Sequence, residues 1–149
     1  MLAGCASGSG ELHRVPGVTS QWQGRLAIKV TQPQTNAFAA AFELHGSAER
    51  GQLTLSTPLG TTLATLNWTA DAAFLTTTGS PQRFDSVQAL TLYATGVDIP
   101  VTQLFAWLEG NEAAAQGWEV DLRDFELGRV SARRSGLDLQ AELKIVIER

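Results

Sequence analysis

Residues 137–147 read LDLQAELKIVI, and this stretch decides the fold. Apolar and polar side chains alternate along it with a period of two, which sends successive side chains to opposite faces of an extended strand. The positions on the apolar face are Leu137, Leu139, Ala141, Leu143, Ile145 and Ile147. Because the other face is polar, the stretch predicts an amphipathic β-strand that borders a core on one side only.

The same period recurs upstream of this strand. Leu26, Ile28 and Val30 alternate with polar or small residues, and the pattern resumes after a break at residues 32–34. Because several such segments follow one another at short intervals, we expect an antiparallel meander. The further predicted strands contain Phe38 to Leu44, Leu53 and Leu55, Ala64 to Trp68, Ala72 to Thr77, Trp118 to Leu122, and Val130 to Ala132.

Two helices are predicted between the strands. The first begins at Asp85, with Gln88 three residues later as in a capping box, and ends at Gly96. The second lies between Pro100 and Gly110, and its apolar residues recur at i, i+3, i+4 and i+7. Helices this short do not hold alone in water, so both must pack on the sheet. The predicted fold is mainly β (α+β): a curved antiparallel sheet with short helices in its concave face.

Composition limits the classes of function. The chain has 149 residues, of which 44% are hydrophobic and 17% charged, as expected for one folded domain. The net charge of −4 and the pI of about 5.1 argue against a nucleic-acid partner, because phosphate binding needs a basic surface. No window approaches the roughly 20 consecutive apolar residues of a membrane-spanning helix.

Signatures of catalysis are absent from the sequence. His13 and His45 have no metal-ligand spacing, and neither a nucleophile elbow nor a phosphate-binding glycine loop occurs. Acidic pairs such as Asp121 and Asp124 are typical of solvated turns. We therefore predict no enzyme, no catalytic residue, no metal site and no cofactor.

Cys5 is the only cysteine, and it follows residues 2–4 in the sequence LAGC. This matches the lipobox of bacterial lipoproteins, in which the cysteine is lipidated. The basic and apolar regions of an export signal do not precede it, so we interpret Met1 as a truncated or misassigned start. The sequence ASGSG that follows is typical of a flexible linker. We expect residues 1–20 to be lipobox and tether, and residues 21–149 to form a single domain.

The loop at residues 56–62, STPLGTT, places a large apolar side chain near the tip of a hairpin. Pro58 and Gly60 are turn residues, so Leu59 between them is expected either to face water or to fold back onto the sheet edge. Spacing alone leaves both alternatives open. An exposed Leu59 would suit contact with acyl chains or a bilayer.

Four motifs carry a resemblance to a known family. They are GRLA at 24–27, LTLSTPLGTT at 53–62, DIPV at 98–101, and Leu104 with Trp107, Leu108 and Gly110. Their order and spacing resemble those of the LolB family of outer-membrane lipoproteins. The region after Gly117 is shorter than the family's pattern.

The resemblance implies a half-barrel of the LolA/LolB kind with an apolar cavity for the acyl chains of client lipoproteins. It implies a monomer anchored through Cys5 at the periplasmic face of the outer membrane, which receives clients from a LolA-like periplasmic carrier and inserts them into that membrane. Pro58, Leu59 and Gly60 match the family's transfer loop. The candidate cavity residues are Phe38, Phe42, Leu53, Leu55, Leu66, Phe74, Leu90, Leu104, Phe105 and Leu108.

Two other interpretations stay open: a soluble LolA-like carrier, and a lipid-anchored structural or scaffolding protein whose core is filled. Cys5 argues against the first, and a measurable cavity would argue against the second. Although the chain is acidic overall, its arginines are candidates for a local basic face toward an acidic carrier. They are Arg123, Arg129, Arg133 and Arg134.

Overall fold

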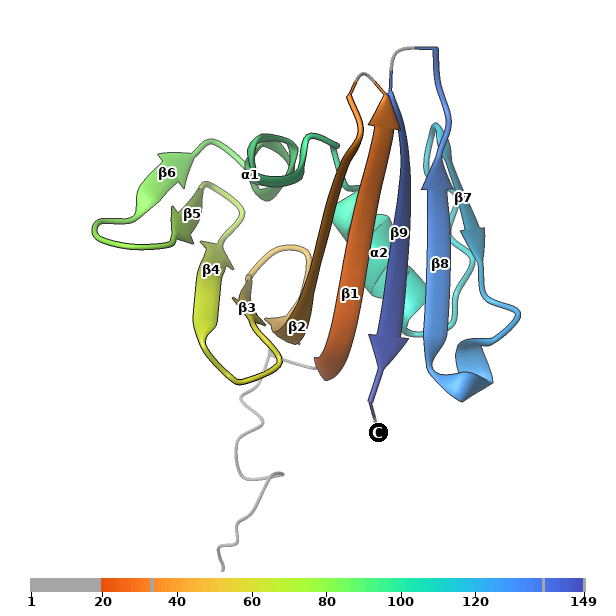
Figure 1. The fold of residues 1–149 in the computed structure, drawn as a ribbon, viewed down its shortest axis with the longest axis horizontal. Coiled ribbons are helices and arrows are strands. Elements are labelled where there is room, and N and C mark those ends of the chain that lie inside the picture. The colour runs from red at the N-terminus through yellow and green to blue at the C-terminus, as the bar shows by residue number, and fades with distance from the viewer. Residues whose placement is uncertain (1–19, 33, 138, 149) are drawn as a thin grey trace, which may run out of the picture.

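The computed structural model describes residues 20–32, 34–137 and 139–148 (Figure 1). Residues 1–19 of the predicted tether, with the lipobox Cys5, lie outside the described residues, as does Asp138 in the strand predicted at 137–147. None of the helices in the described part is long and apolar enough to cross a membrane.

The described residues form one nine-stranded antiparallel sheet with the strand order β6-β5-β4-β3-β2-β1-β9-β8-β7. The sheet is curved (Figure 1). It is open, because no pairing joins its two edge strands, β6 and β7. The predicted half-barrel is therefore confirmed. The strands are β1 Gln21–Gln32, β2 Asn36–Gly46, β3 Gly51–Ser56, β4 Thr62–Trp68, β5 Ala73–Thr76, β6 Gln82–Phe84, β7 Trp118–Asp121, β8 Arg129–Arg134 and β9 Gln140–Ile147.

The sheet consists of two meanders joined in the middle. Strands β1 to β6 follow one another across one half, and β7 to β9 form the other half. Pairing of β1 with β9, from Gly24 opposite Ile147 to Gln32 opposite Gln140, joins the halves. The chain between β6 and β7 must therefore pass from one outer edge of the sheet to the other, and both α-helices lie in this crossover (Figure 1).

The two α-helices lie close to their predicted positions. Helix α1, Val87–Thr95, ends at Gly96 in the left-handed conformation, as predicted. Its N-cap is Ser86 and not Asp85: the Ser86 hydroxyl accepts a 3.0 Å hydrogen bond from the amide of Ala89. The carboxylate of Asp85 instead lies 3.4 Å from Arg83. Helix α2, Val101–Leu108, follows Pro100, and a short 3₁₀ helix, η2 (Phe125–Leu127), precedes β8.

The alternating patterns give the correct strands but not every boundary. Ala141, Leu143 and Ile145 of β9 are buried, which confirms the strand predicted from this segment. Leu137 is wrong as a core position, because β9 begins only at Gln140 and the Leu137 side chain is almost fully exposed. The three-residue strand β6 was not predicted, since it is too short to show a period.

The crossover is fixed to the sheet on the β7–β8 side. The Trp107 side chain of α2 is fully buried, donates a 2.8 Å hydrogen bond to the carbonyl of Ala113, and packs against Trp118 with ring centroids 6.2 Å apart. Before α2, the Asp98 carboxylate lies 3.7 Å from the Arg134 guanidinium of β8. Asp98 of the DIPV motif and Trp107 of the following motif therefore anchor the crossover to the sheet.

Gly24 of the GRLA motif allows β1 and β9 to approach each other. Its φ of +154° is a conformation that side-chain-bearing residues rarely adopt. A Cβ atom at this position would collide with the backbone carbonyl of Val146, which cannot move without disturbing β9. The glycine is therefore required by the pairing that joins the two meanders.

We predict that Gly24→Ala lowers the free energy of unfolding by more than about 3 kcal/mol, because strain and steric overlap add. Gly79→Ala is the matched control: Gly79 has a φ of +80° but open space around its Cβ position, so only the conformational cost of about 1–2 kcal/mol remains. Urea unfolding followed by circular dichroism compares the two. Equal losses would show that the contact with Val146 has no energetic weight.

Candidate functional site

An apolar cavity of about 480 Å³ lies between the concave face of the sheet and the two helices. Nearly every lining side chain is aliphatic or aromatic. Strands β1 to β5 and β9 supply one wall, and α1, α2 and the link between them supply the other. Such a size and lining are typical of small-ligand sites, although polar groups that would orient a polar ligand are few.

Eight of the ten predicted cavity residues line this space: Phe38, Phe42, Leu53, Leu55, Leu66, Leu104, Phe105 and Leu108. Phe74 does not, because it stands opposite Asn67 and Arg83 on the other face of the sheet and is partly exposed. Leu90 does not either: it belongs to α1, and its side chain is fully buried in the core. That the eight hold acyl chains stays a prediction.

Several lining residues were not among the candidates. They include Leu26, Leu63, Trp68, Tyr93, Ile99, Val101 and Ile145. The apolar alternation of β1, β4 and β9 carried a signal for some of them. Tyr93 and Ile99 have no such pattern, because only the crossover path brings them to the cavity.

Two threonines of the cavity wall, Thr91 and Thr95, have their hydroxyl groups hydrogen-bonded within the protein. The Thr91 hydroxyl donates to the carbonyl of Gln88 at 2.8 Å and accepts from the amide of Ile99 at 3.2 Å. The Thr95 hydroxyl donates to the carbonyl of Thr91 at 2.7 Å. Because these two hydroxyl groups already have hydrogen-bond partners, they do not require a polar ligand. The lining of the cavity therefore favours a hydrocarbon.

Leu59 stands at the tip of the β3–β4 turn with 96% of its side chain exposed. The amide of Gly60 donates to the carbonyl of Thr57 at 2.9 Å, and the amide of Thr57 donates to the carbonyl of Thr61 at 2.9 Å. Gly60 has a φ of +96° and Pro58 occupies the position before Leu59, so the turn is well determined locally. Of the two alternatives left open by the sequence, Leu59 faces water and does not fold back.

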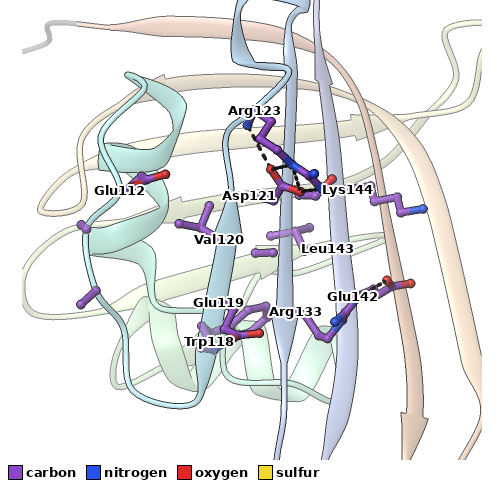
Figure 2. Close-up of a pocket in the computed structure, with 14 residues that line it drawn as sticks. Glu112, Trp118, Glu119, Val120, Asp121, Arg123, Arg133, Glu142, Leu143 and Lys144 are labelled. Carbon is purple, nitrogen blue, oxygen red and sulfur yellow. Dashed lines mark hydrogen bonds and ion pairs between the residues drawn. The ribbon is translucent and has the colours of Figure 1, made fainter.

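A second, larger hollow of about 630 Å³ lies beside β7 and is polar (Figure 2). Two ion pairs lie in it: Arg123 lies 2.7 Å from Asp121, and Arg133 lies 3.8 Å from Glu142. The hydrogen bonds from Arg123 hold the pKa of Asp121 at about 2, below its usual range. A groove lined by solvated charged side chains has no affinity for hydrocarbon, so the smaller apolar cavity is the candidate site.

The four arginines do not form the predicted basic face. Arg129 and Arg133 each lie two positions from Ser131, on one face of β8, whereas Arg134 points to the other face and pairs with Asp98. Arg123 and Arg133 are paired with carboxylates as well.

Among the described residues, no group of three His, Cys, Asp or Glu side chains is placed to hold a metal ion.

An open antiparallel half-barrel whose concave face encloses an apolar cavity defines the class: a small cavity-forming protein suited to apolar ligands. The family model described as "Outer membrane lipoprotein LolB" matches residues 20–140. The chain therefore belongs to the LolB family of outer-membrane lipoproteins.

Two curated relatives illustrate the match. The outer-membrane lipoprotein LolB of Shewanella sp. (strain MR-7) is 41% identical over 88 residues, which cover 59% of this chain and 40% of the relative. That of Shewanella denitrificans (strain OS217) is 32% identical over 117 residues, covering 74% of this chain and 56% of the relative. The match thus spans less than two thirds of either relative's own length.

We predict that Leu59→Glu leaves the free energy of unfolding within about 0.5 kcal/mol of the wild type, because the side chain makes no buried contact. Leu66→Glu, at a site with 5% exposure in the cavity wall, should unfold the domain, since it buries a charge. Thermal unfolding followed by circular dichroism measures both. Unfolding of Leu59→Glu would show that the turn packs against the domain.

Proposed function

We propose that this protein accepts client lipoproteins from a LolA-like periplasmic carrier, holds acyl chain in the apolar cavity, and inserts the client into the outer membrane. The observation that carries the proposal is the apolar cavity of about 480 Å³ beside a fully exposed leucine turn. Membership of the LolB family supports the same role. Cys5, lipidated, is proposed as the anchor, and the protein is proposed to act as a monomer.

The capacity of the cavity fits a hydrocarbon chain. At ~30 Å³ for a group the size of a water molecule, which a methylene group resembles, about 480 Å³ holds roughly 16 such groups. Burial contributes about 0.8 kcal/mol per methylene group, so one chain gains substantially by entering. Transfer of the acyl chain from one apolar site to another changes its burial free energy little. A modest difference in affinity between the two sites is therefore enough to drive transfer without ATP or metal.

The exposed turn supplies contact with the membrane. Leu59 gains little from remaining in water, whereas insertion of its side chain among lipid acyl chains is favourable. Pro58 and Gly60 fix the turn, so its apolar tip is presented without an ordering cost at the time of contact. The cavity favours this function over that of a scaffold with a filled core.

We predict that Ala64→Phe weakens binding of a fluorescent fatty-acyl probe at least tenfold, because the larger side chain occupies cavity volume. Ala39→Phe is the control, since Ala39 is exposed and does not line the cavity. Fluorescence titration gives both affinities, and circular dichroism checks folding. Unchanged binding by folded Ala64→Phe would place the acyl chain elsewhere.

We predict that Leu59→Glu still accepts a lipidated client from a purified LolA-like carrier but loses most delivery to liposomes, because a carboxylate resists entry into the bilayer. Leu137→Glu is the matched control, as Leu137 is a leucine exposed to 95% in another loop. Client distribution after flotation of the liposomes is the measurement. Equal delivery by the two variants would remove Leu59 from the mechanism, and failure of the wild type to take the client would overturn the proposed function.

A further inference from the structure

Half of strand β2 has a neighbour on one side only. Its pairing with β1 extends along the strand to Asn36, opposite Val30. Its pairing with β3 stops at Ala41, opposite Ser56. Within residues 20–32, 34–137 and 139–148, no strand pairs with the second edge of residues 36–40. We call this segment the free β2 edge.

The free β2 edge arises because β3 ends early. After Ser56 the chain enters the Leu59 turn, and Pro58 has no N–H with which to extend the ladder. The turn returns the chain to β4 at Thr62, opposite Ser56. The Leu59 turn therefore begins at the point where β2 loses its partner.

The free β2 edge carries none of the usual protection. Its sequence is NAFAA, with no lysine, proline or other residue that blocks pairing, and its first four residues are exposed. In an antiparallel ladder, alternate residues direct their N–H and C=O groups away from the paired neighbour. These main-chain groups are the chemistry that recognises an extended polypeptide.

The free β2 edge also borders the mouth of the apolar cavity. Three large lining side chains are substantially exposed: Phe38 at 40%, Leu63 at 39% and Tyr93 at 62%. They come from β2, β4 and α1, and Phe38 lies within the free β2 edge itself. An acyl chain that enters between them leaves its head group beside residues 36–40.

We propose that the free β2 edge binds, by main-chain pairing, the polypeptide segment that directly follows the lipidated cysteine of a client. The proposal rests on the proposed function, because acyl chain in the cavity brings that cysteine to the mouth. Main-chain hydrogen bonds do not depend on side-chain identity, so one edge serves clients of different sequence. The cavity then selects the lipid, and the edge selects an extended chain attached to it.

The test uses a triacylated cysteine followed by six residues, titrated onto the full chain. Two backbone-methylated versions are the matched controls, one N-methylated at the even positions and the other at the odd positions. Only one series removes the N–H groups that face β2. We expect that series to bind about tenfold more weakly and the other to bind like the unmodified peptide, since two or three hydrogen bonds are lost.

Hydrogen exchange of the β2 amides provides the second measurement. The lipopeptide should protect amides within residues 36–40, whereas palmitate alone should bind in the cavity and leave them unprotected. Equal affinity of all three lipopeptides without new protection would overturn the edge proposal but leave the acyl site standing. Failure of both palmitate and the lipopeptide to bind would overturn the proposed function instead. Protection of the amides within residues 36–40 that is present without ligand and is lost on dilution would show that the edge pairs with a second copy of this chain. That result would also overturn the proposal.

Discussion

Pairing between β1 and β9 is the interaction on which the rest of the structure depends. It joins a six-stranded meander to a three-stranded one, and it requires a glycine at position 24 because no side chain fits against the carbonyl of Val146. Once this ladder exists, β6 and β7 are at opposite edges of the sheet. The chain that connects them crosses the concave face (Figure 1). This crossover supplies the second wall of the cavity.

The cavity persists because the crossover is anchored on the β7–β8 side of the sheet and does not fill the space toward β3 and β4. Trp107 fixes α2 against the β7–β8 side through its ring contact with Trp118 and its hydrogen bond to Ala113. The ion pair of Asp98 with Arg134 ties the link between the helices to β8. Toward β3 and β4 the helices leave space lined by aliphatic side chains, and short helices cannot fill it. An open sheet thus keeps an apolar interior accessible from one side.

The motifs that led to the family divide into two physical roles. Gly24, Asp98 and Trp107 build the frame: Gly24 permits a close backbone approach, Asp98 forms an ion pair with Arg134, and Trp107 is buried and hydrogen-bonded to Ala113. Leu59 makes none and is held out in water by a turn whose hydrogen bonds are local. The exposure of Leu59 is the feature on which its proposed contact with an apolar phase rests, and its turn begins where the free β2 edge starts.

The sequence by itself determined the local structure of this protein. Strict alternation in 137–147 and spacing of i, i+3, i+4 and i+7 in 101–108 report which face of each element is buried, and the structure confirms β9 and α2 on that basis. Only the tertiary structure decided the burial of Leu90, the outward direction of Phe74, the exposure of Leu59 and the existence of the cavity. The physical reason is that periodicity records the environment of one element, whereas a void depends on how closely elements distant in sequence approach one another.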